Sequence, residues 1–335
     1  MKTDDFSDTR RKLMQGAAAG FVVAAAGPGF SQAEAAAAAS TDAGLQDPRE
    51  LYAHGPFDPQ TQPWPGLASR MSPRPDHGES TYRGSGKLNG RKALITGGDS
   101  GIGRAAAIAY AREGADVAIS YLPAEEEDAR DVIRLIQAAG RKGVALPGDI
   151  RDEAFCNAMV NRAVGELGGL DILVSNAARQ QSHDSILDIS TEQFDWTIKT
   201  NIYALFWITK AAIPHMQPGS AIVMTSSINA YEPGINIVDY AMTKAAIMNY
   251  SKGLSKQMIK RGIRVNAVAP GHFWTPLQVT GGQTEANLHD FGGQTPLKRP
   301  GQPAELAPIY VFLASNQASY VTGQVYGATG GMGQP

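Results

Sequence analysis

The sequence has a single cysteine, Cys156, among 335 residues, which excludes an internal disulfide framework and any multi-cysteine metal site. Its six histidines are scattered, and no two of them stand four residues apart, as a helical metal site requires. We therefore expect no structural or catalytic metal. The 30 Lys and Arg residues are balanced by 32 Asp and Glu residues, so we expect no nucleic-acid partner.

A long, strongly apolar run is also missing. The most hydrophobic stretch near the N-terminus is rich in Ala and Gly and is broken by Gly27-Pro28-Gly29, whereas a spanning helix needs about 20 continuous apolar residues. Arg10-Arg11 precedes this stretch and Ala33-Glu34-Ala35 follows it. A signal peptide has the same order: a charged region, then an apolar region, then a cleavage site with small residues.

The paired arginines resemble a twin-arginine (Tat) signal in particular. Residues 1–40 are therefore predicted to be a cleaved signal that the Tat export machinery reads, which leaves a periplasmic mature protein without a membrane segment. The alternative is an Ala-rich tail with a chance arginine pair on a cytoplasmic protein.

Prolines crowd the region that follows. They stand at Pro48, Pro56, Pro59, Pro63, Pro65, Pro73 and Pro75. This density excludes long helices and central strands. Residues 41–87 are predicted to be an extended Pro-rich arm, which either lies over the globular domain or acts as a linker.

From residue 88 to residue 335 the chain alternates between short apolar runs and helical patterns. The expected strands cover residues 92–96, 116–122, 143–149, 170–176, 220–227 and 263–270, and the expected helices cover residues 101–114, 125–140, 153–168, 191–216 and 241–262. This order predicts right-handed crossovers and a parallel sheet covered on both faces. The expected fold is a single α/β, doubly wound, Rossmann-type domain, with its ligand at the carboxyl ends of the strands.

A glycine-rich turn follows the first expected strand, with the spacing G-x-x-x-G-x-G. Glycine permits a tight turn, close approach of the backbone to a pyrophosphate and close packing of the next helix. That helix offers unpaired N–H groups and the positive end of its dipole to phosphates. The turn therefore predicts nucleotide binding by Gly97, Asp99, Ser100, Gly101, Ile102 and Gly103.

Five further motifs follow in order. They are "SNAA" at residues 175–178, Asn201 in "KTNIYALF", Ser227 in "VMTSSINAY", "YAMTK" at residues 240–244 and "APGHFWTP" at residues 269–276. With the glycine turn, this set resembles the short-chain dehydrogenase/reductase family. Ser175 and Ala178 depart from the family's usual asparagine and glycine. The region from Gln60 onward resembles an arm-bearing branch of bacterial oxidoreductases and general stress proteins.

The resemblance implies an enzyme that transfers hydride between NAD(P) and a small carbonyl or alcohol substrate. Tyr240 and Lys244 lie one helical turn apart, on one face. In the family pattern Lys244 lowers the pKa of Tyr240 and binds the nicotinamide ribose, and Tyr240 exchanges a proton with the substrate. Ser227 holds the substrate oxygen, and Asn201 completes a proton relay. The other implied cofactor contacts are Tyr121, Asp149, Ile150, Asn176, Ala177, Pro270, Gly271 and Thr275.

Cofactor choice depends on the end of the second expected strand, Ser120-Tyr121-Leu122, where an acid favours NAD and an arginine favours NADP. No acid occurs there before Glu125, and this absence favours NADP, whereas the lack of a nearby base leaves NAD open. We expect Trp274, Gln180, Gln181 and His183 to line the substrate pocket. A small aldehyde or ketone fits such a lining, and a sugar dehydrogenase is the alternative. A nucleotide-sensing protein without catalysis is a third interpretation.

Assembly is expected by analogy alone. Family members usually form homotetramers through the helices that here begin at Thr191 and Tyr240, and the apolar faces of both helices allow it. The Tat route carries folded proteins, so an exported enzyme could bind its dinucleotide in the cytoplasm before it crosses the membrane.

Overall fold

The computed structural model describes residues 44–333, and Asp47–Pro335 form one compact unit. Arg10-Arg11 and the rest of the predicted signal peptide lie outside the described residues, so export stays a prediction from the sequence. Between residues 44 and 333, no helix combines the length and apolar character that crossing a bilayer requires.

A parallel sheet forms the centre of the unit, with the strand order β3-β2-β1-β4-β5-β6-β7. The strands are β1 (Lys92–Thr96), β2 (Asp116–Tyr121), β3 (Gly143–Pro147), β4 (Ile172–Ser175), β5 (Ala221–Thr225), β6 (Arg264–Pro270) and β7 (Val325–Ala328). Each neighbouring pair is parallel, as the sequence predicts for a doubly wound domain. The strand order reverses between β1 and β4, which is where such sheets bind ligands.

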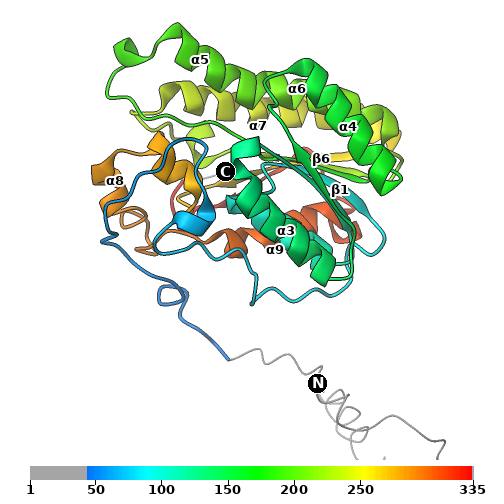
Figure 1. The fold of residues 1–335 in the computed structure, drawn as a ribbon, viewed down its shortest axis with the longest axis horizontal. Coiled ribbons are helices and arrows are strands. Elements are labelled where there is room, and N and C mark those ends of the chain that lie inside the picture. Colours follow the sequence, from blue (N-terminus) through cyan, green and yellow to red (C-terminus); the bar gives the residue numbers. More distant parts are fainter. Residues whose placement is uncertain (1–43, 334–335) are drawn as a thin grey trace, which may run out of the picture. The chain divides into compact units, whose positions relative to one another are not determined.

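Helices cover both faces of the sheet (Figure 1). One face packs against α2 (Gly101–Arg112), α3 (Glu126–Ala138) and α9 (Pro303–Ala314), and the other packs against α4 (Glu153–Leu167), α6 (Ala204–Ala212) and α7 (Val238–Met258). The short helices α5 (Thr191–Ile198) and α8 (Glu285–His289) complete the set. Two buried apolar clusters, one on each face, therefore hold the sheet between two helical layers.

Local sequence signals explain the helix boundaries. In α3 the buried apolar residues Ala129, Val132 and Ile136 recur at helical spacing, while charged residues occupy most other positions. Helix α4 begins after Asp152, whose side chain accepts a hydrogen bond from the Ala154 N–H group, and it ends at Gly168, which has a left-handed backbone.

Two expectations about the elements need correction. The helix expected over residues 191–216 is divided into α5 and α6 by a π-helical turn, Lys199–Tyr203. The series of expected strands and helices ended with the strand at residues 263–270, which is β6. In the structure, α9 follows it, and β7 pairs with β6. Strand β7 was missed because it is a short edge strand, "VYGA", that contains a glycine and is only partly buried, so it lacks a clear apolar pattern.

Residues 47–87, here called the N-terminal segment, contain the short 3₁₀ turn Ala68–Arg70 and no strand. The segment lies along the region around α8 (Figure 1), where the Phe57 N–H group donates to the His289 carbonyl over 2.9 Å. Its apolar side chains join a third buried cluster with residues of the loop after β6. The members are Phe57, Met71, Trp274, Val279, Leu288 and Phe291.

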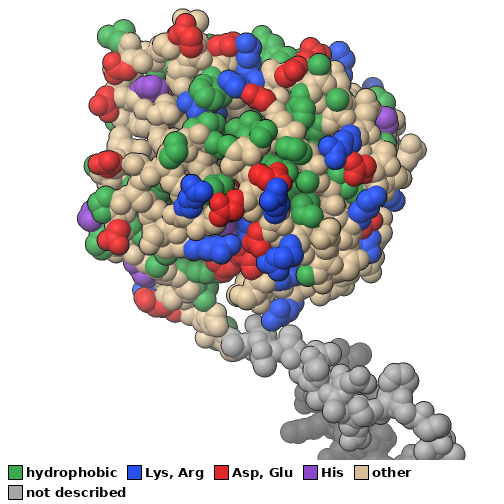
Figure 2. Space-filling model, viewed as in Figure 1, with side chains coloured by type: hydrophobic (Ala, Val, Ile, Leu, Met, Phe, Trp, Pro, Cys, Tyr) green, Lys and Arg blue, Asp and Glu red, His purple; other side chains and the backbone are tan. Residues whose placement is uncertain are grey.

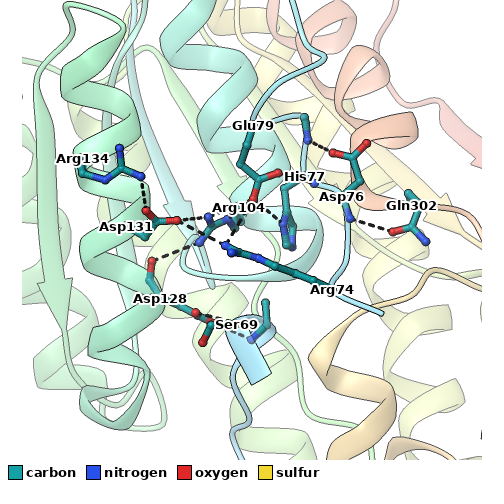
Figure 3. A network of polar contacts seen from close by, with 12 residues as sticks. Ser69, Arg74, Asp76, His77, Glu79, Arg104, Asp128, Asp131, Arg134 and Gln302 are labelled. Carbon is teal, nitrogen blue, oxygen red and sulfur yellow. Dashed lines mark hydrogen bonds and ion pairs between the residues drawn. The ribbon is translucent and has the colours of Figure 1, made fainter. Parts of the chain in front are cut away.

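A buried charge network joins the same segment to α2 and α3 (Figure 3). Arg104 of α2 is completely buried and pairs with Asp131 of α3 and with Glu79 of the segment. Asp128 accepts hydrogen bonds from the N–H groups of Ala68 (2.6 Å) and Ser69 (3.3 Å). One arginine thus connects three parts of the chain, close to the helix that follows the glycine turn.

Charge on the surface is evenly mixed. Lys and Arg side chains alternate with Asp and Glu on the face that Figure 2 draws, and pairs such as Arg130 with Glu126 lie 2.8 Å apart. The nearly balanced composition is therefore also a local balance on this face.

The buried network predicts an unequal cost of two arginine substitutions. Arg104→Met leaves Glu79 and Asp131 without their shared partner, and we expect the free energy of unfolding to fall by about 3 kcal/mol. This loss is at the lower end of the range for broken buried ion pairs, because both carboxylates keep some solvent contact. Arg130→Met breaks an exposed pair and should cost below about 1 kcal/mol. Urea denaturation measures both, and equal losses would contradict the role of burial.

Candidate active site

The glycine turn joins β1 to α2 and has the geometry that a pyrophosphate requires. Gly97 and Gly101 have positive φ angles of 62° and 50°, which favour glycine. A Cβ atom at Gly103 would overlap the Gly97 carbonyl oxygen, so α2 packs against the turn only because residue 103 has no side chain. Ser100 stands at the N-cap and its side chain makes no capping bond, which leaves N–H groups of the first turn free for phosphates.

A cleft lies at the carboxyl ends of the strands, around this turn. Most of the residues singled out from the sequence line it: Gly97, Asp99, Ser100, Gly101, Ile102, Tyr121, Asp149, Ile150, Asn176, Ala177, Ser227, Tyr240, Pro270, Gly271 and Thr275. Gly103, Asn201 and Lys244 are buried and contribute no surface to it. The structure therefore gathers segments from six strand ends, β1 to β6, around one cavity.

Tyr240 and Lys244 lie on α7, and both are buried. The Lys244 Nζ atom lies 5.3 Å from the centre of the Tyr240 ring, and it donates a hydrogen bond of 2.8 Å to the Thr225 carbonyl at the end of β5. Ser227 follows the same strand end, and its Oγ accepts bonds from the Asn229 N–H group (3.1 Å) and side-chain amide (3.2 Å).

Burial moves the pKa values of this pair in directions that differ from the expectation. Desolvation raises the pKa of Tyr240 to about 12, although hydrogen bonding with Ser227 acts in the opposite direction. Desolvation also lowers the pKa of Lys244 to about 7. In the protein without cofactor, burial therefore outweighs any effect of Lys244 on the pKa of Tyr240. The expectation that Lys244 and the positive nicotinamide ring together favour the phenolate stays a prediction for the enzyme with its cofactor.

Asn201 lies in the π-helical turn between α5 and α6. Its side-chain amide is already engaged: Oδ1 accepts from the Arg179 N–H group (2.7 Å), and Nδ2 donates to the Arg179 carbonyl (2.9 Å) and to the Thr243 hydroxyl (3.0 Å). The asparagine thus ties the loop after β4 to α7. Its link to Lys244 is expected to run through a water molecule and stays a prediction.

The expected substrate lining is wrong. Trp274 is completely buried in the cluster with the N-terminal segment, and its indole N–H group donates to the Pro73 carbonyl over 2.8 Å. Gln180 is buried and bonds to the Gly282 carbonyl, and neither Gln181 nor His183 lines the cleft. Phe273, the neighbour of Trp274, lines it instead. The sequence could not tell which of two adjacent aromatic residues faces inward.

The far end of the cleft gathers charged groups near β2 and β3. Burial, reinforced by the charge of Asp99, raises the pKa of Glu125 to about 9. Asp99 is itself buried, which raises its pKa to about 7. The sequence showed no base beside β2, yet Arg151 also lines the cleft, from the turn after β3, where it pairs with Asp149 at 2.6 Å.

Several lining residues were missed, among them Trp64, Pro65, Arg151 and Trp196. Trp64 and Pro65 lie in the Pro-rich stretch, where no periodicity marks a functional position. Trp196 occurs within an ordinary helical pattern. Only Arg151, two residues after Asp149, carried a signal, namely a charge beside a predicted adenine contact.

Comparison with known proteins agrees with this geometry. Residues 97–333 match the family model described as Enoyl-(Acyl carrier protein) reductase. The chain is 58% identical over 287 residues to the uncharacterized oxidoreductase YghA of Escherichia coli, which covers 86% of this chain and 98% of that protein.

Two further relatives have named activities. Glucose and ribitol dehydrogenase of Daucus carota is 42% identical, over 83% of this chain and 97% of that protein. NADPH-dependent aldehyde reductase 1 of Arabidopsis thaliana is 41% identical, over 80% of this chain and 94% of that protein.

Among solved structures, a short-chain dehydrogenase from Burkholderia cenocepacia in complex with NADP superposes with a TM-score of 0.69. It is 33% identical, and the match covers 73% of this chain and 98% of that chain. The family resemblance inferred from the motifs is thereby confirmed. The chain belongs to the short-chain dehydrogenase/reductase family and is an oxidoreductase.

Proposed function

We propose that this oxidoreductase is an NAD(P)-dependent reductase of small aldehydes and ketones, which also oxidises the corresponding alcohols. One observation carries the proposal: Ser227 and Tyr240 line the same cleft as the glycine turn. A proton donor and a phosphate-binding turn thus share one cavity. The name of the Arabidopsis thaliana relative, an NADPH-dependent aldehyde reductase, supports this reaction.

Ser227 and Tyr240 act on the substrate oxygen. A bound nicotinamide dinucleotide supplies the hydride that the carbonyl carbon receives. Ser227 Oγ accepts two bonds from Asn229, so its hydroxyl keeps one proton to donate, and that proton can turn from Tyr240 to the substrate oxygen. Tyr240 donates its phenolic proton to the same oxygen as negative charge develops there.

Lys244 and Asn201 support Tyr240 from behind. Within residues 44–333, one of the three Lys244 N–H groups has a hydrogen-bond partner, the Thr225 carbonyl. The other two can bind a ribose hydroxyl or the phenolate that proton transfer leaves on Tyr240. We propose that Asn201 positions the loop after β4 against α7 through Arg179 and Thr243. A relay from Asn201 to Lys244 stays a prediction.

For the cofactor we propose NADP in preference to NAD. The raised pKa of Glu125 leaves this carboxyl largely uncharged near pH 7, so it does not repel a 2′-phosphate. Arg151 adds a guanidinium to the lining of the cleft. The Burkholderia cenocepacia neighbour was solved with NADP.

A sugar dehydrogenase is the second candidate. The Daucus carota relative, named for glucose and ribitol, favours it. Membership in an oxidoreductase family sets aside the interpretation as a non-catalytic nucleotide sensor. Glucose or ribitol oxidation that is faster than aldehyde reduction would favour the second candidate.

The role of Tyr240 is tested by removal of one oxygen atom. Tyr240→Phe should lower kcat for aldehyde reduction at least about 10²-fold, because the proton donor is lost. Affinity for NADPH and NADH, measured by fluorescence titration, should stay as in the unmodified protein, with NADPH bound more tightly. Tyr250→Phe, on the same helix but outside the cleft, is the matched control. Normal turnover by Tyr240→Phe would refute the mechanism.

The raised pKa of Tyr240 predicts a pH dependence. A phenol with a pKa of about 12 is protonated near neutral pH, so it can donate in reduction but must ionise before it accepts a proton in oxidation. We expect kcat/KM for NADP in alcohol oxidation, which reports the groups of the free enzyme, to rise with pH without a plateau up to about pH 10. Initial rates with NADP and ribitol or a small alcohol measure this. A plateau near pH 7 would show that the tyrosine ionises far more easily than its burial implies.

We also propose that the chain assembles into a homotetramer through α5, α6 and α7. Large apolar side chains remain about half exposed on these helices and on the π-helical turn between them. They are Phe194, Tyr203, Phe206 and Met242. Exposed apolar side chains gathered on neighbouring elements mark an interface.

A charge placed on these helices should disrupt the assembly. Phe206→Glu is expected to shift the mass measured by light scattering from tetramer to smaller species, because the glutamate would be buried without a partner. Tyr320→Glu, at a fully exposed loop position, should leave the mass unchanged. A monomeric unmodified protein, or equal masses for both variants, would contradict the proposal.

A further inference from the structure

Four side chains from four parts of the chain form one continuous stack. Trp64 comes from the N-terminal segment, Arg179 from the loop after β4, Trp196 from α5 and Arg151 from the turn after β3. The Arg179 guanidinium lies 5.0 Å from the ring centre of Trp64 and 3.9 Å from that of Trp196. The Arg151 guanidinium lies 4.5 Å from the ring centre of Trp196. Each indole therefore has a guanidinium over its face.

The stack holds Trp64 by an interaction that solvent does not weaken. Arg179 is only 6% exposed, and among the described residues its Nε and Nη1 atoms have no hydrogen-bond acceptor. Only Nη2 is bonded, to Gln193 (3.0 Å) and Gln181 (3.4 Å). No carboxylate bonds to it there, although the charge of Asp239 favours the charged guanidinium. The two indole faces also stabilise this buried cation, and removal of Trp64 removes one of them.

The position of Trp64 is fixed from the other side as well. Gln62 closes a small loop, because its side-chain amide donates to the Leu67 carbonyl (3.0 Å) and accepts from the Leu67 N–H group (2.8 Å). Trp64 and Pro65 lie within this loop. The Gln62 N–H group donates to the Val279 carbonyl over 2.9 Å, which attaches the loop to the segment after β6.

These contacts place the segment across the cleft. Residues 275–278 line the cleft beside the Val279 attachment, and Trp196 and Arg151 line it beside the stack. Trp64 and Pro65 contribute to the lining between these two walls. The Trp64 indole N–H group is buried and has no acceptor among the described residues, whereas a dinucleotide carries many phosphate and ribose oxygens.

We propose that Trp64 is a cofactor-retaining residue: it connects the two walls of the dinucleotide cleft and must leave Arg179 before a bound dinucleotide can escape. The proposal rests on the proposed function, because it assigns the cleft to NAD(P). It gives the N-terminal segment a direct part in binding. The affected quantity is the dissociation rate, since a residue that closes an occupied cleft slows exit.

The test measures release of NADPH from the complete protein. The protein is loaded with NADPH, excess NADP is added in a stopped-flow instrument, and the loss of NADPH fluorescence gives the dissociation rate. Trp64→Ala should raise this rate about tenfold or more. Arg179→Met should raise it as well, and the double variant should be no faster than the faster single one, because both changes break the same contact.

Two matched variants separate retention from general loss of structure. Trp64→Phe keeps an aromatic face over Arg179 and should retain slow release. Tyr52→Phe removes a hydrogen bond within the same segment, from Tyr52 to Asp76, which lies outside the lining of the cleft. This variant should leave the dissociation rate unchanged. Thermal unfolding of each variant identifies any variant that has lost its fold. If Trp64→Ala is unfolded, the dissociation rate of NADPH from Arg179→Met tests the proposal.

The outcomes distinguish the two proposals. If the unmodified protein binds neither NADPH nor NADH, the proposed function fails and retention fails with it. If it binds NADPH and the folded Trp64→Ala and Arg179→Met variants release it at the unmodified rate, the proposed function stands and retention by Trp64 is refuted. Faster release in both variants, with Tyr52→Phe unchanged, supports it.

Discussion

The close approach of α2 to the end of β1 is the constraint on which the site depends. Gly103 lies against the Gly97 carbonyl with no room for a side chain, so the helix N-terminus sits directly at the strand end where the sheet order reverses. Every other part of the cleft is arranged around that point. The β4 loop approaches through Asn176, whose backbone and side-chain bonds go to Thr96 and Gly97, and α7 brings Tyr240 to the opposite end.

Burial sets the chemistry of the groups around this cleft. The same desolvation that keeps the phenol of Tyr240 protonated makes Lys244 easier to deprotonate, and it leaves Glu125 uncharged at the far end. A protonated phenol can donate to a carbonyl oxygen, and an uncharged carboxyl group does not repel a phosphate. A positive nicotinamide ring would oppose the first of these shifts.

The N-terminal segment extends the family fold into the site. Buried charges hold the segment at Arg104 and Asp128, and an apolar cluster holds it at Trp274. The N-terminal segment therefore fixes the position of Trp64 at the cleft. Slow release of a dinucleotide would suit a protein that crosses a membrane folded, as the arginine pair predicts. Export and retention of the cofactor are independent proposals, because retention depends on contacts within residues 47–333 alone.

The sequence by itself determined what depends on neighbours along the chain. Alternating apolar runs predicted the parallel sheet, glycine spacing predicted the turn, and a four-residue spacing placed Tyr240 beside Lys244. Tertiary structure decided which side chains meet across the sheet. It buried Trp274 and exposed Phe273 to the cleft, used the amide of Asn201 for packing, and brought Trp64 to Arg179 across more than a hundred residues. Such contacts have no local periodicity, because they follow from how layers pack and not from the order of residues.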